Sequence, residues 1–228
     1  MRVLALETSE RVGSLTTLQA NKKQISKVGG TLLPSDQRSA RSLLPTIQTL
    51  LAESGWKPNQ LDLLCVTTGP GSFTGIRIGV TTAKTLAYAT GAALVGVHTL
   101  AAIAAAVSAP QERLWTILDA QRQELFVAQF KPDWQDHPDD IPETHIVGVE
   151  QWLQELVPGD VVSGPPLQKL ADRLPAGVLV ADRNEWQPQA EAVGRLGVAA
   201  YQRGRSVDAI QLVPRYYRKS AAEEKADA

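Results

Sequence analysis

The chain has 228 residues, a formal net charge of −1 at pH 7 and one cysteine. This length can bury a hydrophobic core as one domain or as two small lobes. The balanced charge argues against a general attraction to nucleic acid or anionic membranes, and one cysteine excludes a disulfide framework and a cysteine-based zinc site. The apolar stretches are too short to span a bilayer and no signal peptide is apparent, so we expect a cytoplasmic location without membrane contact.

The first half of the chain alternates between strand and helix patterns. The predicted elements, in chain order, are strands at 3–8, 13–18 and 22–29, a helix over 37–54, a strand at 61–67, a helix that ends at Gly91, a strand at 94–97 and a short helix from Thr99. Short polar turns join the first three strands, which predicts an antiparallel meander.

The second half repeats strand and helix patterns at smaller size. The predicted elements are strands at 113–118 and 125–130, a surface loop over 131–142, a helix over 150–156, a strand at 161–163, a helix over 166–173, a strand at 178–181 and a helix over 188–203. We therefore expect an N-terminal lobe over 1–109, a C-terminal lobe over 110–219 and a disordered tail over 220–228.

A glycine-rich turn joins the strand at 61–67 to the long helix, and it reads Gly69-Pro70-Gly71-Ser72-Phe73-Thr74-Gly75-Ile76-Arg77-Ile78-Gly79. Such a turn exposes backbone N–H groups that can hold an anion. A Walker loop needs glycine before its Lys-Thr pair, but Ala83 precedes Lys84. The dinucleotide-binding pattern fails at its third glycine position, which is Thr74.

Small residues recur every fourth position along this helix, at Gly75, Gly79, Ala83 and Ala87. They share one ridge of the helix surface, where another backbone can approach closely. Each helical glycine costs about 1 kcal/mol relative to alanine, so a close contact must offset that cost. The contact is either the chain's own sheet or a helix from another subunit, and we predict the second as the functional role.

The glycine-rich turn from Gly69 to Arg77 resembles the signature of the TsaB (YeaZ) family. The resemblance extends from Leu4-Ala5-Leu6-Glu7-Thr8-Ser9 to Pro214-Arg215-Tyr216-Tyr217-Arg218 and is weak between Lys131 and Val161. It implies an α/β fold of the actin/hexokinase-like (ASKHA) type, with two lobes of mixed sheets flanked by helices and a reduced second lobe. It also implies a subunit without catalytic activity of its own, a partner of TsaD in forming N6-threonylcarbamoyladenosine at an anticodon-loop adenosine of tRNA.

The resemblance further implies how the subunit assembles. The expected partners are a TsaD-like transferase, a TsaE-like ATPase and tRNA through the complex, with a homodimer in isolation. No cofactor is expected on this chain alone, although ATP or ADP is possible at the complex interface. The predicted partner interface comprises Gly71, Ser72, Phe73, Thr74, Gly75, Arg77, Gly79 and Ala83.

Candidate phosphate loops are weak in this sequence. Glu7, Thr8 and Ser9 end the first strand, where ASKHA kinases place a phosphate loop, and we interpret them as a vestigial loop whose hydroxyls also suit a plain turn. Asp119 could mark the second phosphate loop, but Ala120 follows where that loop needs glycine. A stand-alone ASKHA-type ATPase or kinase remains the alternative function.

No catalytic or metal-binding constellation stands out. The three histidines lack ligand spacing, and Ser39 stands where many TsaB-like sequences have histidine. Ser72 lies outside a nucleophile elbow and suits a helix cap, and Cys65 lies in an apolar strand, so a peptidase finds no support. Arginines near the C-terminus, with Tyr216 and Tyr217, form either a tRNA contact or a solvated surface.

Overall fold

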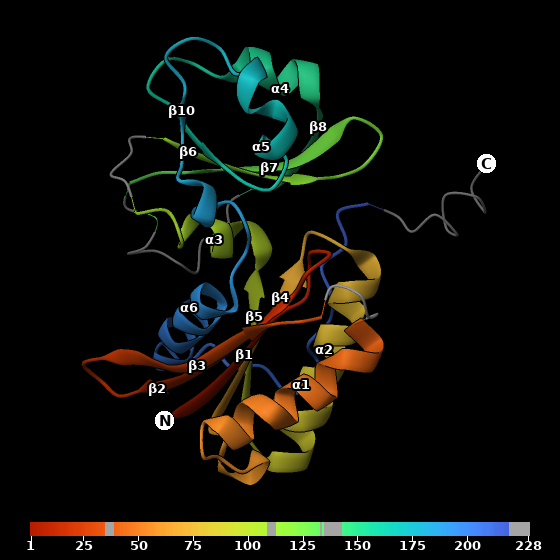
Figure 1. The fold of residues 1–228 in the computed structure, drawn as a ribbon, viewed down its shortest axis with the longest axis vertical. Helices are drawn as coiled ribbons and strands as arrows, with labels where there is room; N and C mark the ends of the chain where they lie inside the picture. The colour runs from red at the N-terminus through yellow and green to blue at the C-terminus, as the bar shows by residue number, and fades with distance from the viewer. Residues whose placement is uncertain (35–38, 109–112, 133, 135–142, 219–228) are drawn as a thin grey trace, which may run out of the picture.

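The computed structural model describes residues 1–34, 39–108, 113–132, 134 and 143–218. It contains two five-stranded mixed sheets, each flanked by helices, which form two lobes stacked along the long axis (Figure 1). The predicted α/β class is confirmed. The predicted boundary between residues 109 and 110 and the predicted tail over 220–228 lie outside the described residues. None of the described helices is long and apolar enough to cross a membrane.

The first lobe is built on a sheet in the order β3-β2-β1-β4-β5. Its elements are β1 (Arg2–Glu7), β2 (Ser14–Ala20), β3 (Ile25–Leu32), α1 (Ser39–Glu53), η1 (Pro58–Gln60), β4 (Leu63–Gly69), α2 (Phe73–Thr90), β5 (Ala93–His98) and α3 (Thr99–Ala104). The predicted meander of β1, β2 and β3 is confirmed, with β4 and β5 added in parallel. β3 begins three residues later than predicted because Asn21 Oδ1 accepts hydrogen bonds from the N–H groups of Lys23 and Gln24, which makes 21–24 the hairpin turn.

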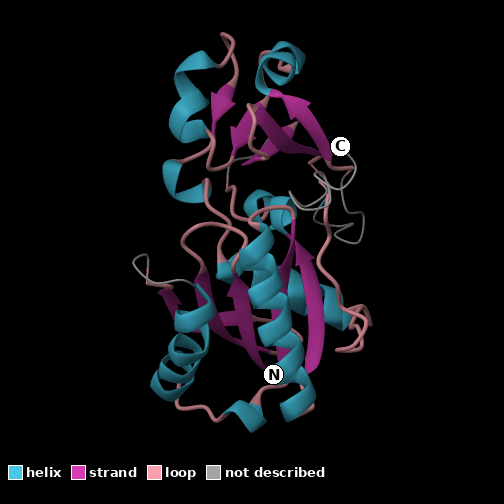
Figure 2. Ribbon diagram, turned by 90° about the vertical axis from the view of Figure 1, so that its right-hand side faces the viewer, coloured by secondary structure: helices cyan, strands magenta, loops and turns pink. Residues whose placement is uncertain are grey.

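Both faces of this sheet are covered by helices, because the side chains of β1 alternate between them. Leu4 and Leu6 pack with the apolar residues of α1 and α2. Val3 and Ala5 pack on the opposite face against α6 (Ala190–Gln202). Figure 2 shows the helices on either side of the sheet.

The second lobe is built on a sheet in the order β10-β9-β6-β7-β8. Its elements are β6 (Leu114–Asp119), β7 (Glu124–Phe130), β8 (His145–Gly148), α4 (Val149–Glu155), β9 (Val161–Ser163), α5 (Leu167–Leu170), η3 (Ala171–Arg173), β10 (Leu179–Val180) and η4 (Arg183–Glu185). β8 is an addition to the predicted elements, which include no strand between 131 and 160. Trp152 of α4 is fully buried in the core of this lobe.

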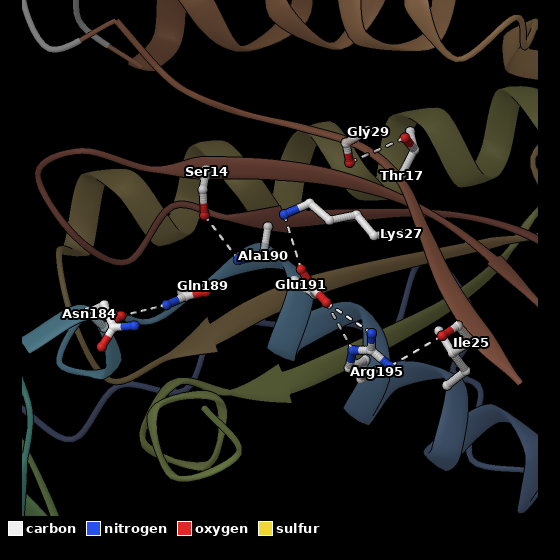
Figure 3. A network of polar contacts seen from close by, with 10 residues as sticks. All are labelled: Ser14, Thr17, Ile25, Lys27, Gly29, Asn184, Gln189, Ala190, Glu191 and Arg195. Atoms are coloured by element: carbon white, nitrogen blue, oxygen red, sulfur yellow. Dashed lines mark hydrogen bonds and ion pairs between the residues drawn. The ribbon is translucent and has the colours of Figure 1, made fainter. Parts of the chain in front are cut away.

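The predicted lobe boundaries are wrong for the last part of the chain, because α6 returns to the first lobe. The backbone N–H of Ala190 donates to Ser14 Oγ at 3.0 Å, and Glu191 forms ion pairs with Lys27 at 3.0 Å and Arg195 at 2.9 Å (Figure 3). Only residues up to about η4 therefore belong to the second lobe. A local sequence pattern does not show to which sheet a late helix returns.

Residues 207–218, which we call the C-terminal strap, run back along the first lobe. Val207 N–H donates to Leu94 at the free edge of β5, and Lys84 Nζ of α2 donates to the carbonyl oxygens of Ile210 and Leu212 at 3.0 and 2.9 Å. Leu212 is buried in the core beneath α2. The strap therefore joins α2, the β5 edge and, as described below, the second lobe.

Candidate functional site

The glycine-rich turn places the start of α2 against the end of β1. Ser72 caps the helix as predicted, since its Oγ accepts a hydrogen bond from Gly75 N–H at 3.2 Å. Gly69 and Gly71 have φ values of 125° and 139°, which favour glycine. A side chain at Gly71 would overlap Ser9, and one at Gly69 would overlap the strap at Arg215. The turn therefore serves close backbone packing inside the chain.

The ridge of small residues on α2 packs against the chain itself, which corrects the prediction that it receives a partner. A Cβ at Gly75 would overlap the Thr8 carbonyl oxygen, and one at Gly79 would overlap Thr8 Oγ1. Ala83 is fully buried beside them. The reason is geometric: α2 must lie over the end of β1 to follow the glycine turn, and only a bare ridge leaves room for Thr8.

The opposite face of α2 is open. Thr74, Arg77, Thr81, Thr85 and Tyr88 are exposed along it, and Tyr88 retains 85% of its accessible surface. Of the predicted interface residues, Ser72, Thr74 and Arg77 are exposed and Phe73 is half-buried, whereas Gly75, Gly79 and Ala83 are buried and Gly71 faces Ser9. Thr81, Thr85 and Tyr88 are not among the predicted interface residues, and their exposure agrees with their spacing opposite the glycine ridge.

The vestigial phosphate loop is closed. Glu7, Thr8 and Ser9 are each at most 1% exposed. Glu7 Oε1 accepts hydrogen bonds from the backbone N–H and the Oγ of Ser9, and Ser72 N–H donates to the Ser9 carbonyl oxygen at 2.7 Å. Burial raises the pKa of Glu7 to about 8, because its Oε2 is buried with no hydrogen-bond partner among the described residues. The loop therefore packs as a core element in this structure.

The turn between β6 and β7 holds the strap. Gln121, Arg122 and Gln123 are exposed and adopt left-handed backbone angles, with φ between 55° and 64°. Asp119 Oδ1 accepts a hydrogen bond from Gln121 N–H at 2.7 Å. Arg218 of the strap donates to the Ala120 carbonyl oxygen and pairs with Glu124. The side chain of Arg218 is therefore already bonded within the chain. This weakens the interpretation of the arginines near the C-terminus as a tRNA contact.

A cavity of about 380 Å³ lies where the two lobes and the strap meet. Its walls include Phe73 at the start of α2, Asp119 at the end of β6, and Tyr216 and Tyr217 of the strap. It adjoins the exposed start of α2, so a molecule bound there would touch both lobes.

His98 is the strand-end residue that the sequence predicts. Its Nε2 lies 2.8 Å from Tyr217 Oη and 3.2 Å from Thr144 Oγ1. Burial, with a smaller contribution from the charge of Arg215, lowers its pKa to about 3, which keeps the ring neutral. Within the described ranges, no three His, Cys, Asp or Glu residues group as metal ligands. Cys65 is buried, which raises the pKa of its thiol and keeps it protonated.

Comparisons with known proteins agree with this architecture. The family model of TsaD, described as tRNA N6-adenosine threonylcarbamoyltransferase, matches residues 15–179. The tRNA threonylcarbamoyladenosine biosynthesis protein TsaB of Escherichia coli (strain K12) is 26% identical over 99% of this chain and 98% of its own length. The corresponding protein of Haemophilus influenzae is 33% identical, over 57% of this chain and 53% of its own length.

Solved structures show the same fold. YeaZ from Pseudomonas aeruginosa superposes with a TM-score of 0.70 and 24% identity, over 94% of this chain and 99% of that one. A second Pseudomonas aeruginosa structure, described as an uncharacterized protein similar to peptidase YEAZ, gives 0.74 at 23% identity, over 95% and 99% of the two chains. The two-lobe ASKHA-like fold expected from the sequence is thus confirmed.

Proposed function

The chain belongs to the family described by the tRNA N6-adenosine threonylcarbamoyltransferase model and, within it, to the TsaB (YeaZ) group, and we propose that it is the partner subunit of a TsaD-like transferase. In this role it binds and stabilises the transferase that forms N6-threonylcarbamoyladenosine at an anticodon-loop adenosine of tRNA. The chain contributes no catalytic residue by itself, and it works in the cytoplasm, where its tRNA substrate is modified.

The observation that carries this proposal is the contrast between the two sides of α2. One side is sealed against the end of β1, and the loop that would hold phosphate in an ASKHA kinase is buried with it. The other side presents Thr74, Thr81 and Thr85, small side chains that let a second helix approach. A closed loop and an open helix face suit a docking subunit better than a stand-alone ATPase or kinase.

The docking surface that we propose is the outer face of α2, defined by Thr74, Arg77, Thr81, Thr85 and Tyr88. It replaces the buried glycine ridge as the contact with the transferase. Without the transferase, two copies of this chain would pair through the same face in an isologous dimer. A TsaE-like ATPase would join the complex, with ATP or ADP at the shared interface and tRNA bound through the assembly.

Reconstitution tests this function. A TsaD-like transferase and a TsaE-like ATPase from the same organism would be mixed with tRNA and threonylcarbamoyl-adenylate, with and without this chain, and the modified adenosine would be quantified. We expect modification only when this chain is present, and none from this chain alone. Equal modification without it would contradict the proposal, as would tight magnesium-dependent ATP binding by the isolated chain, which favours the alternative of an independent ATPase.

A further inference from the structure

The guanidinium of Arg77 is held in one orientation at the exposed start of α2. Its Cζ lies 3.8 Å from the ring centre of Phe73, one helical turn earlier, and its Nε donates to Tyr216 Oη at 2.7 Å. The rings of Phe73 and Tyr216 contact each other with centroids 4.7 Å apart. Two aromatic side chains from separate segments therefore fix an exposed cation.

This cation has no acidic partner within the described part of the chain. Its Nε makes the one hydrogen bond that joins Arg77 to the described residues, and its terminal nitrogens have no hydrogen-bond partner among these residues. Four other arginines are ion-paired: Arg113 with Asp160, Arg173 with Glu150, Arg195 with Glu191 and Arg218 with Glu124. We call the terminal nitrogens of the Arg77 guanidinium the fork. Because the guanidinium is already oriented, it loses little conformational entropy when the fork donates two hydrogen bonds to an anionic group.

Resting on the proposed function, we propose that Arg77 binds a carboxylate side chain of the TsaD-like partner, and that Tyr216 positions the fork for it. Arg77 lies on the outer face of α2 between Thr74 and Thr81, at the rim of the docking surface, where a charge pair sets register and association rate. The cavity beside it is lined by Asp119 together with Arg215 and Arg218, and Arg218 is already paired with Glu124. On the outer face of α2, Arg77 is the one cation among Thr74, Thr81, Thr85 and Tyr88, which matches a single carboxylate better than a polyanion such as RNA.

Three variants and a matched control test the fork. Arg77→Lys keeps the charge but loses the bidentate geometry and the stacking, and we expect it to weaken binding to the TsaD-like transferase about tenfold or more. Tyr216→Phe keeps the ring on Phe73 but removes the hydroxyl, and we expect a smaller loss. The control is Arg183→Lys, for which no loss of affinity is expected. Arg183 is exposed in the second lobe, and its Cζ lies 5.8 Å from the ring centre of Trp186. Calorimetric titration gives the Kd values, and thermal melts verify folding.

Non-additivity identifies the positioning role of Tyr216. In the double variant, adding Tyr216→Phe to Arg77→Lys should cost less affinity than Tyr216→Phe costs alone, because the hydroxyl acts through the fork. Fully additive losses would overturn that role. Unchanged affinity of Arg77→Lys, with a wild type that binds the transferase, would overturn the inference and leave the proposed function standing. A wild type that does not bind would overturn both. If the isolated wild type binds inorganic phosphate saturably and Arg77→Lys does not, the fork is a phosphate site. That result would overturn the proposed contact between Arg77 and a carboxylate of the partner.

Discussion

At the scale of single residues, the interpretation of α2 depends on whether its glycine ridge faces the chain's own core or the solvent. An exposed helical glycine replaced by alanine would raise the free energy of unfolding by about 1 kcal/mol. Gly79→Ala should instead lower it by about 1–3 kcal/mol, because the new methyl group would overlap Thr8 Oγ1. Chemical denaturation measures the change, and Thr85→Ala on the exposed side of α2 serves as control. A stabilised Gly79→Ala protein would show that the ridge is open.

We expect Glu7 to make the free energy of unfolding depend on pH. Its folded pKa of about 8 lies above the ordinary carboxyl value of 4.5, so the folded state holds a proton that the unfolded state releases between these values. Its contribution is complete below about pH 4.5 and falls as pH rises toward 8. Glu7→Gln should make the free energy of unfolding less dependent on pH between about 4.5 and 8. Its free energy of unfolding relative to wild type should therefore be highest near pH 8. Denaturation across pH measures this difference, and parallel curves for the two proteins would contradict it.

At the scale of elements, the strap behaves as part of the core. Leu212 is 7% exposed and packs beneath α2, whereas Ile210, two residues earlier, is 79% exposed. Leu212→Ala should therefore lower the free energy of unfolding by about 2–4 kcal/mol, whereas Ile210→Ala should change it by less than about 0.5 kcal/mol. Equal effects in urea denaturation would show that the strap is detached in solution.

The elements also show what the sequence could and could not predict. Strands such as β1 and β4 were predictable because their apolar runs are short and bounded by turns. The four-residue spacing of small side chains placed Gly75, Gly79 and Ala83 on one face of α2. This spacing does not predict what covers that face. Ile76 and Val80 beside the ridge, with threonines opposite, are the signal that favours the chain's own core. The positions of α6 and the strap depend on contacts far apart in sequence, which local patterns do not record.

At the scale of the whole molecule, the two lobes and the docking face are tied together by the strap. Tyr216 contacts the start of α2, Tyr217 lies between His98 and Phe126, and Arg218 holds the β6–β7 turn. The central claim is that the outer face of α2, beside this junction, binds the transferase.

Titration of the TsaD-like transferase with Thr81→Arg, compared with wild type, tests that claim most directly. Thr81 is exposed at the middle of the face, so an arginine should leave folding intact and obstruct the approach of a second helix. Gln154→Arg, on the exposed side of α4 in the other lobe, controls for added charge. The account predicts saturable binding by wild type and Gln154→Arg, with loss of binding by at least about tenfold in Thr81→Arg. Equal affinity of all three proteins would contradict it.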